Sequence, residues 1–215
     1  MIDRFPESRA YIRVIITRGE GEIGLDPELA GTNNLVIICR QLQENPSWWY
    51  QKGVEVIITD RLRISRKAVD PNLKSGNYLN NVLAMQEARK QNAFDAIMLN
   101  AKGHVTEGTT SNVWIVKNQT FITPPLEAGL LGGITRKTLI ELAQNHGLKV
   151  LEKNITADEL LSSDEAFLTA STKKVVPIVK INQKSIGNGA PGPMTQKLLG
   201  LYLDLVDTHV KNFQR

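Results

Sequence analysis

Two apolar runs rich in β-branched residues, 11–18 and 34–42, stand near the start of the chain. A long segment rich in Gly, Pro and Asn separates them, and these residue types favour turns. The pattern predicts two strands joined by a long loop. The polar segment 43–47 then interrupts the apolar pattern, so we place a domain boundary there, between residues 1–46 and 47–215.

Beyond this boundary, apolar runs of strand length alternate with segments of helical periodicity. The predicted strands are residues 54–59, 96–99, 104–106, 113–116, 120–122, 165–169 and 175–181. Short turns at 100–103 and 117–119 join neighbouring strands, which indicates antiparallel pairing. The predicted helices are residues 79–91, 135–146 and 193–213, with a short helix after the capping-box sequence at 156–159. This order of elements predicts an α+β fold.

Two of the predicted helices are amphipathic. The helix over 79–91 has Leu79, Val82, Leu83 and Gln86 on one side, with Glu87, Arg89 and Lys90 on the other. The last helix carries on one side Leu198, Leu201, Tyr202, Leu205 and Val206. Gly147 follows the middle helix, and we expect it to end that helix in a left-handed conformation.

Composition excludes several classes of protein. Of the 215 residues, 41% are hydrophobic and 22% are charged, which is enough to form a buried core. The apolar runs are too short to cross a bilayer and residues 1–5 do not begin a signal peptide, so we expect a cytoplasmic protein without a membrane partner. Cys39 is the single cysteine, which excludes a disulfide framework and favours a buried core thiol. His104, His146 and His209 lack the spacing of metal ligands, so we expect no metal site.

The formal net charge is +4 and the pI is about 9.2, which raises the question of nucleic-acid binding. The basic residues are nevertheless scattered and are not interleaved with aromatic residues, so we expect no nucleic-acid partner. The densest basic segment, 61–67, alternates basic with other residues. This alternation predicts that its charges share one exposed face of a strand or loop.

Three short motifs carry candidate chemistry. Lys74 supplies an amine that can form an imine, provided that burial or a nearby positive charge keeps the amine neutral. Glu107 follows a predicted strand and can hold the proton of a pyridinium ring. Gly132 and Gly133 precede a helix whose first N–H groups can bind a phosphate. Together these groups indicate a site for pyridoxal phosphate (PLP).

Each motif also has an ordinary structural interpretation. Taken alone, Lys74 is best explained as a surface lysine, and Glu107 is explained equally well as a carboxylate in a turn. The glycines can be no more than a helix cap. A hydroxyl cluster at 169–172 ends a predicted strand and can close the phosphate site from the other side. The specificity therefore lies in the joint pattern.

With Lys74, Glu107, Thr135 and Ser171 in this order, the chain resembles the class IV, or fold-type IV, PLP-dependent aminotransferases. This family includes branched-chain amino acid aminotransferase, D-amino acid aminotransferase and aminodeoxychorismate lyase. The resemblance covers nearly the whole chain, and the segments that carry it are residues 74–81, 107–112, 123–125, 133–136 and 164–167.

The resemblance implies roles for individual residues. Lys74 would be the catalytic residue, which carries PLP as an imine and transfers the proton, and Glu107 would pair with the pyridine nitrogen. Tyr78 would bond the 3-oxygen of the cofactor, although a core aromatic at a helix start is an alternative interpretation. The phosphate would be bound by Ile134, Thr135, Ala170 and Ser171, and the substrate by Thr110 and Thr172.

The resemblance also implies a fold and an activity. The expected fold is a small α/β N-terminal piece followed by a larger, mostly antiparallel pseudo-barrel, assembled as a homodimer. The expected activity is transfer of an amino group between an amino acid, with the branched-chain type favoured, and a 2-oxo acid. Two alternatives stay open, a β-elimination of the aminodeoxychorismate-lyase type and a non-catalytic, truncated relic of the family.

Three departures from the family pattern bear on this expectation. The family places further strands ahead of the strand at 11–18, and one of them carries a phosphate-binding arginine. Their absence here suggests a truncated chain. We expect such a chain to bind phosphate more weakly and to have an uncovered sheet edge. Lys173 and Lys174 stand where many relatives carry a small residue and then an acid. They can replace the arginine in part, but we expect them to be exposed. Ile23 lies where relatives specialised for D-amino acids or aminodeoxychorismate place an arginine, which favours the branched-chain type.

Overall fold

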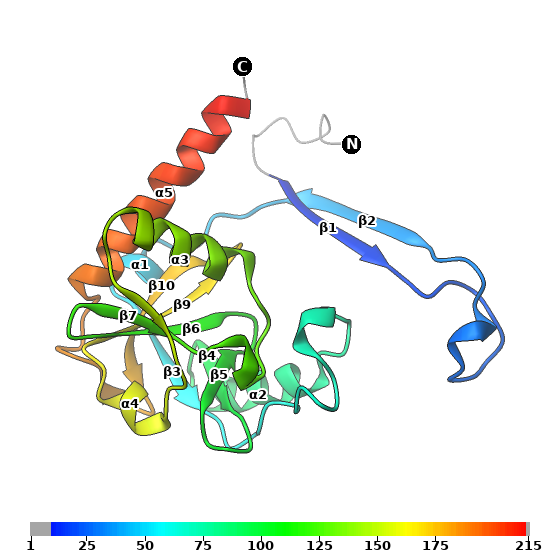
Figure 1. Ribbon diagram of the computed structural model, residues 1–215, viewed down its shortest axis with the longest axis horizontal. Helices are drawn as coiled ribbons and strands as arrows, with labels where there is room; N and C mark the ends of the chain where they lie inside the picture. Colours follow the sequence, from blue (N-terminus) through cyan, green and yellow to red (C-terminus); the bar gives the residue numbers. More distant parts are fainter. Residues whose placement is uncertain (1–9, 214–215) are drawn as a thin grey trace. The chain divides into compact units, whose positions relative to one another are not determined.

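The computed structural model describes residues 10–213, in two compact units that divide between Asn45 and Pro46 (Figure 1). The first unit is an antiparallel pair of strands, β1 (Ala10–Ile16) and β2 (Leu35–Gln41). The loop between them contains the short 3-10 helix η2 (Pro27–Leu29). The two strands predicted for this part of the chain are confirmed.

Cys39 lies on β2 opposite Ile12 and is half-buried. The expectation of a buried core thiol is wrong, because no second layer of structure among residues 10–45 covers the two strands. Val14 in the same pair of strands is 60% exposed, which agrees with this explanation.

The second unit alternates strands with helices along the chain. Its strands are β3 (Val54–Ile58), β4 (Asp95–Leu99), β5 (Val105–Gly108), β6 (Asn112–Lys117), β7 (Thr120–Thr123), β8 (Val150–Glu152), β9 (Glu165–Ala170), β10 (Lys174–Ile181) and β11 (Lys184–Ser185). Its α-helices are α1 (Trp48–Gln51), α2 (Leu79–Lys90), α3 (Ile134–Asn145), α4 (Ala157–Leu161) and α5 (Pro193–Phe213), and its 3-10 helices are η3 (Pro71–Leu73) and η4 (Leu126–Ala128). The predicted elements are confirmed, whereas α1, β8 and β11 are too short to have been recognised from a periodic pattern.

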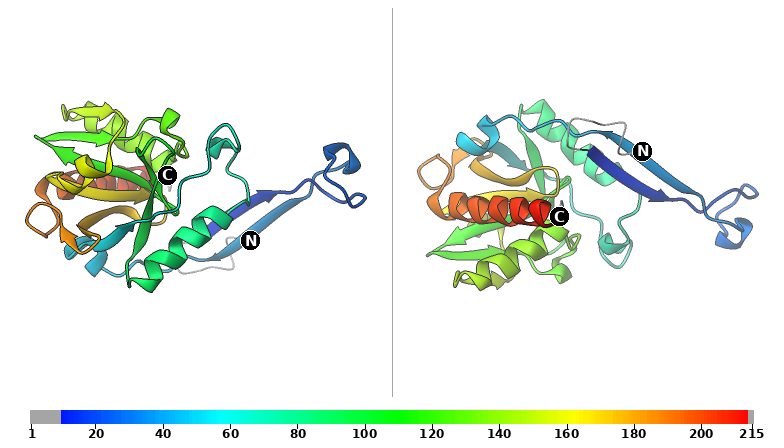
Figure 2. Two further views of the ribbon diagram at one scale, coloured as in Figure 1. Left: turned by 90° about the horizontal axis from the view of Figure 1, so that it is seen from below. Right: turned by 90° about the horizontal axis from the view of Figure 1, so that it is seen from above.

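The strands β3, β4, β5, β6, β9 and β10 close into a ring. β9 pairs antiparallel with β6 on one side and with β10 on the other, and this double pairing closes the sheet. β3 runs parallel to both β10 and β4, and the remaining pairs of the ring are antiparallel. The result is the mostly antiparallel pseudo-barrel that was expected, and α5 lies in front of its strands in the right-hand view of Figure 2.

Most strands of the ring are buried on both faces. Along β6, Val113 and Ile115 belong to one apolar cluster, whereas Trp114 and Val116 belong to another. Because successive side chains of a strand point to opposite faces, one cluster fills the inside of the ring and the other lies under the helices. Strands with two buried faces have continuous apolar sequences, which is the pattern seen here.

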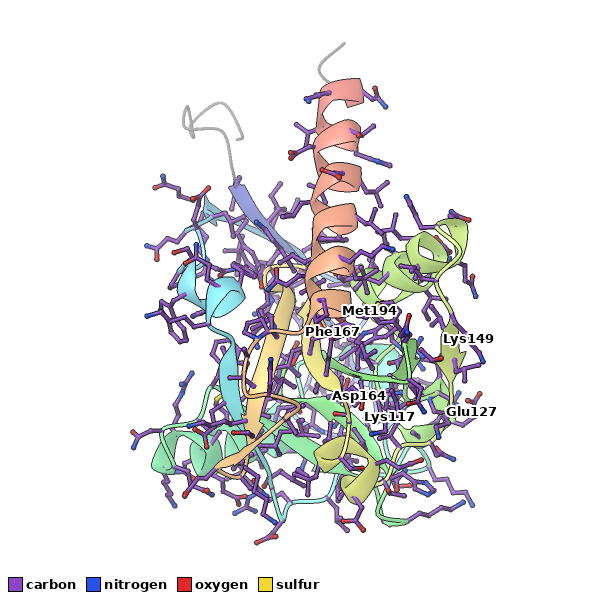
Figure 3. All side chains as sticks on the ribbon, turned by 90° about the vertical axis from the view of Figure 1, so that its left-hand side faces the viewer. Lys117, Glu127, Lys149, Asp164, Phe167 and Met194 are labelled. Carbon is purple, nitrogen blue, oxygen red and sulfur yellow. The ribbon has the colours of Figure 1, made fainter. Side chains whose placement is uncertain are left out.

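α3 and α5 cover the outer cluster. The rings of Trp114 and Phe167 stack there with their centroids 5.6 Å apart, and Leu139 of α3 and Leu198 of α5 pack into the same cluster. Figure 3 shows Phe167 and Met194 close together where α5 begins. The side of α5 that contains Leu198 therefore faces the core, as its pattern predicts.

α2 packs with the side opposite to the one its sequence suggests. Ala84 and Ala88 are completely buried against β3 and β4, whereas Leu79 is 66% and Val82 58% exposed. The amphipathic pattern of this helix therefore predicts the wrong face as the buried one. Alanine side chains let the helix approach the sheet closely, so small residues rather than large ones mark the contact.

The helix ends follow the predicted signals. Gly147 has a φ of 69°, the left-handed conformation expected after α3. At the start of α4, the Thr156 hydroxyl accepts from the Glu159 N–H at 3.1 Å and the Glu159 carboxylate accepts from the Thr156 N–H at 2.9 Å, which confirms the capping box. Within residues 10–213, no helix combines the length and apolar character needed to cross a bilayer.

The start of α5 is held by a buried carboxylate from another element. Glu165, the first residue of β9, accepts from the N–H groups of Met194 and Thr195 at 2.9 and 2.7 Å and from the Thr195 hydroxyl at 2.7 Å. These N–H groups have no partner inside the helix, and the negative charge lies at the positive end of the helix dipole. Gly192 permits this contact, because a Cβ there would lie 2.0 Å from the Glu165 Cδ.

We predict that Glu165→Ala lowers the free energy of unfolding by about 2–3 kcal/mol, because it removes a charged acceptor and leaves buried donors without a partner. Urea unfolding followed by tryptophan fluorescence measures the change. Glu127→Ala is the matched control, since Glu127 is exposed at the first turn of η4. Equal stability of the two variants would contradict the role given to Glu165.

Candidate functional site

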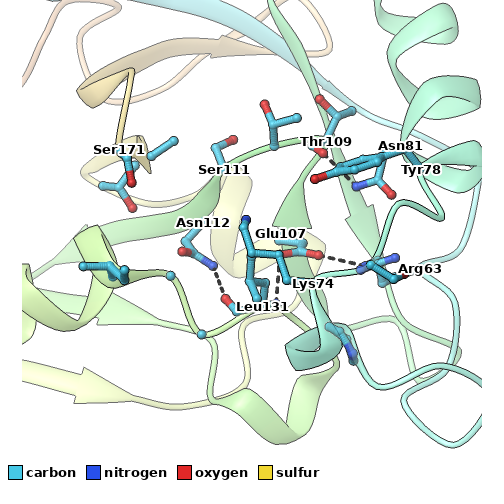
Figure 4. Close-up of a pocket in the computed structure, with 18 of the residues that line it drawn as sticks. Arg63, Lys74, Tyr78, Asn81, Glu107, Thr109, Ser111, Asn112, Leu131 and Ser171 are labelled. Atoms are coloured by element: carbon cyan, nitrogen blue, oxygen red, sulfur yellow. Dashed lines mark hydrogen bonds and ion pairs between the residues drawn. The ribbon is translucent and has the colours of Figure 1, made fainter. Parts of the chain in front are cut away.

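A pocket of about 250 Å³ opens in the second unit where several elements end (Figure 4). Its walls are the loop that precedes α2, the turn from β5 to β6, the end of β9 and the first turn of α3. The volume is near the lower end for small-molecule sites. The pocket is therefore formed by segments that lie far apart in the sequence.

Lys74 stands at the end of η3 and lines this pocket. Its φ of 42° is left-handed, a conformation that costs free energy for a residue with a side chain. Two neighbours fix the turn, because the Asp70 carboxylate accepts from the Asn72 N–H at 3.0 Å and the Asn72 side chain accepts from the Gly132 N–H at 3.1 Å. Among residues 10–213 no carboxylate lies within salt-bridge distance of the Lys74 amine, so no ion pair holds this amine away from the pocket.

Glu107 lies on β5 and is only 6% exposed. Its Oε1 accepts from the Arg63 Nε at 2.8 Å, and its Oε2 accepts from the Leu131 N–H at 3.0 Å. Burial raises the pKa of the Glu107 carboxyl above its ordinary value, while the Arg63 charge, the Leu131 N–H and the Lys74 charge act in the opposite direction. The pocket thus contains a carboxylate held in place by a cation.

The first turn of α3 offers free backbone donors to the pocket. Gly133 caps the helix without a side-chain hydrogen bond, and Ile134 and Thr135 line the pocket. The first N–H groups of a helix have no intrahelical partner and lie at its positive end, so they can bind an anion. Gly133 is required by close packing, because a Cβ there would lie 2.1 Å from the Asn112 Oδ1. The Asn112 Nδ2 also donates to the Leu131 carbonyl at 2.8 Å, which fixes the segment before the helix.

Most residues singled out in the sequence lie around this one pocket. Those that line it are Lys74, Tyr78, Glu107, Thr110, Ile134, Thr135, Ala170 and Ser171. Thr172 is not among the lining residues. The structure places Lys74 and Glu107 on one cavity, where Glu107 is buried and Lys74 is exposed.

Sequence reasoning missed Arg63. Its side chain is 13% exposed and pairs with Glu107, so the expectation that the charges of segment 61–67 share one exposed face is wrong for this residue. Arg61 and Arg66 are 44% and 46% exposed, as expected. No local signal separates Arg63 from its neighbours, because its partner lies 44 residues away in the sequence.

The structure adds one pocket residue and corrects a further expectation. Asn81 was given no role from the sequence, yet it lines the pocket and its Nδ2 donates to the Thr109 carbonyl at 2.7 Å. Lys173 and Lys174 were expected to be exposed, but both are partly buried. The Lys173 side chain is 16% exposed because it pairs with Asp95 on β4. The Lys174 Nζ lies 5.9 Å from the centre of the Tyr50 ring.

The pocket combines three chemical functions: an amine, a buried carboxylate paired with a cation, and a set of backbone donors at a helix start. An amine reacts with a carbonyl, a carboxylate accepts a hydrogen bond from a protonated ring nitrogen, and the backbone donors bind a phosphate. A ligand that carries a carbonyl, a protonated ring nitrogen and a phosphate therefore fits the residues present.

Comparisons with known proteins find relatives over most of the chain. The sequence profile of the family described as amino-transferase class IV matches residues 1–181. The branched-chain-amino-acid aminotransferase of Pseudomonas aeruginosa is 38% identical over 205 residues, which cover 92% of this chain and 64% of that protein. The D-alanine aminotransferase of Bacillus licheniformis is 41% identical over 155 residues, which cover 72% of this chain and 53% of that protein.

A solved structure shows the same fold. The branched-chain amino acid aminotransferase from Thermobaculum terrenum, solved in its PLP-bound form, matches with a TM-score of 0.80 and 30% identity, over 92% of this chain and 64% of that chain. The chain therefore spans between about half and two thirds of the length of these three relatives.

The pair of Arg63 and Glu107 has a testable pH dependence. Because the folded-state pKa of Glu107 is raised, the folded chain binds the proton more tightly than the unfolded chain, and ionisation lowers stability as the pH rises through that pKa. Arg63→Met removes the attraction between the Arg63 charge and the Glu107 carboxylate, which opposes the rise in the Glu107 pKa caused by burial. We predict a loss in the free energy of unfolding of about 2–4 kcal/mol at neutral pH, and a smaller loss at about pH 4 where Glu107 is protonated.

Urea unfolding at both pH values measures this difference. Arg66→Met is the matched control, because Arg66 contacts Asp70 at 3.8 Å with both side chains well exposed. A loss for Arg63→Met that does not change with pH would show that Glu107 is not the group involved.

Proposed function

The chain belongs to the class IV aminotransferases, and we propose that it is a PLP-dependent transaminase that moves an amino group between an amino acid and a 2-oxo acid. The observation that carries this proposal is one pocket that brings together Lys74, Glu107 and the first turn of α3. We propose a branched-chain amino acid as the substrate class, which the 38% identity with the Pseudomonas aeruginosa aminotransferase supports.

The residues of the pocket fit PLP. When bound, this cofactor supplies an aldehyde that reacts with primary amines and a ring that withdraws electron density from the reacting carbon. The N–H groups of Ile134 and Thr135 would hold the phosphate, with Ala170 and Ser171 from the end of β9 on another wall. Tyr78 lines the pocket at the start of α2 and would bond the ring oxygen.

Lys74 would serve both as the amine that attaches the cofactor and as the group that moves a proton at the substrate carbon. General acid–base catalysis needs a side chain within reach of the reacting atom that can accept a proton and return it. No salt bridge within the described chain engages the Lys74 amine, so no ion pair holds it away from the pocket. The left-handed backbone conformation of Lys74 fixes the direction in which its side chain leaves the backbone.

Glu107 would hold the proton of the ring nitrogen. A carboxylate does this only while it is ionised, and burial alone opposes ionisation. Arg63 at 2.8 Å and the Leu131 N–H at 3.0 Å stabilise the ionised form. The chain therefore contains the group and two contacts that favour its ionised form against the effect of burial.

One other substrate class has support from a relative. The D-alanine aminotransferase of Bacillus licheniformis is 41% identical over the part that it shares with this chain. Assays with L- and D-amino acids separate the two classes. Product analysis separates transamination from β-elimination, because transamination yields a 2-oxo acid and a new amino acid, whereas elimination of aminodeoxychorismate yields pyruvate and an aromatic amine. A homodimer in the cytoplasm stays a prediction, and light scattering coupled to gel filtration measures the assembly.

The cofactor test is chemical. We expect the purified chain to take up PLP with a visible absorbance band, and borohydride reduction followed by peptide mass mapping to place the adduct on Lys74. Lys74→Ala should abolish the adduct and lower transamination of branched-chain amino acids with 2-oxoglutarate by at least about 10²–10⁴-fold. Lys67→Ala is the control, because Lys67 is exposed and does not line the pocket.

A folded chain that takes up no PLP would contradict the proposed function. Far-UV circular dichroism of the same sample establishes that the chain is folded. That result would favour the non-catalytic alternative, in which the fold persists without the activity.

A further inference from the structure

A second buried carboxylate lies behind the pocket wall, and the proposed chemistry does not use it. Asp95 is completely buried at the start of β4. Its Oδ1 accepts from the N–H groups of Ala96 and Thr109 at 2.9 and 3.0 Å and from the Thr109 hydroxyl at 2.6 Å. Its Oδ2 accepts from the Ser111 hydroxyl at 3.0 Å. Asp95 therefore holds the turn between β5 and β6, which forms part of the pocket.

Lys173 supplies the countercharge to Asp95 from another turn. Its Nζ lies 3.1 Å from the Asp95 Oδ2 and 5.2 Å from the centre of the Phe94 ring. Lys173 belongs to the turn between β9 and β10, and its N–H donates to the Ala170 carbonyl at 3.1 Å. A single ammonium thus connects the turn that carries Ala170 and Ser171 with the turn from β5 to β6.

The same ammonium also makes a contact that charge compensation does not require. Lys173 Nζ donates to the Thr110 Oγ1 at 3.0 Å, and Thr110 lines the pocket. An ammonium has donors only, so the Thr110 oxygen is the acceptor and its hydroxyl hydrogen remains available to another group. A hydroxyl that accepts from a cation also becomes a stronger donor.

We propose that Lys173 is a positioning residue, which presents the Thr110 hydroxyl as a hydrogen-bond donor to an oxyanion of the bound ligand. Lys173 acts through Thr110 and does not itself touch the ligand. The inference rests on the proposed function for the ligand, whose two oxyanions are the carboxylate of the amino acid and the phosphate of the cofactor. Both present the same chemistry to a hydroxyl donor, so the experiment must distinguish them.

A purely structural role for Lys173 makes a different prediction. In that case the ammonium only neutralises Asp95, and any variant that removes both charges restores the pocket. If Lys173 acts through Thr110, the loss of the ammonium persists after Asp95 is neutralised. The contact at 3.0 Å between Lys173 and Thr110 favours the second role.

The test is calorimetric titration with two probes, inorganic phosphate for the cofactor phosphate and 4-methylvalerate for the substrate carboxylate. Each probe is titrated against the chain with and without PLP. We expect Lys173→Met to weaken binding of one of the two probes by about ten- to a hundredfold, the effect of one charge-assisted hydrogen bond. Thr110→Val should weaken the same probe, and Lys173→Met added to Thr110→Val should cause no further loss.

Two variants control for folding and for charge. Asp95→Asn combined with Lys173→Met removes both buried charges, so the variant avoids an unpaired carboxylate and should still bind the probe weakly. Lys174→Met removes the neighbouring lysine, whose Nζ lies 5.9 Å from the centre of the Tyr50 ring and which does not line the pocket, and it should bind both probes normally.

Three results would overturn the inference. These are unchanged affinity for both probes in Lys173→Met, recovery of affinity in the variant that lacks both charges, and independent, additive losses from Lys173→Met and Thr110→Val. Failure of the proposed function has a separate signature, since it is the absence of a borohydride-reduced adduct on Lys74 in the unaltered chain. The titrations without PLP decide the role of Lys173 in either case.

Discussion

The double pairing of β9, with β6 on one side and β10 on the other, is the constraint on which the second unit depends. Without it the sheet would be open, and the end of β9 would not lie beside the start of β6. In the closed ring Asn112 is opposite Thr169, so the residues that follow β9 and those that precede β6 meet at one edge. The pocket lies at that edge because strand pairing, rather than any single side chain, brings its walls together.

Buried carboxylates then connect the ring to the segments around it. Glu107 holds Arg63 and the segment before α3, Asp95 holds the turn from β5 to β6, and Glu165 holds the start of α5. Each accepts backbone N–H groups or a cation, as a buried charge requires. Two asparagine side chains hold neutral backbone groups, because Asn72 accepts from the Gly132 N–H and the Asn112 Nδ2 donates to the Leu131 carbonyl. Loops with few apolar contacts are thus placed by polar contacts to rigid strands.

The same arrangement explains how the Lys74 amine and an acid are kept apart in a small cavity. Glu107 is committed to Arg63 and to a backbone N–H, so its charge does not capture the Lys74 amine in a salt bridge. Lys173 and Asp95 likewise neutralise each other behind the wall. The charges that support the pocket are therefore paired with one another, and no carboxylate of residues 10–213 pairs with the Lys74 amine.

The sequence alone determined the longer strands, the long helices and the three motifs, because each depends on local information. Continuous apolar runs such as the one around Trp114 predict strands, and Gly147 and the capping box at Thr156 mark helix ends through contacts within a few residues. Only the tertiary structure decided which face of α2 is buried, why Arg63 and Lys173 are not exposed, and that β9 closes the ring. These features depend on partners tens of residues away, such as Glu107 for Arg63 and Asp95 for Lys173. No local pattern contains a partner that distant, because charged residues have the same sequence signature whether they face solvent or a buried carboxylate.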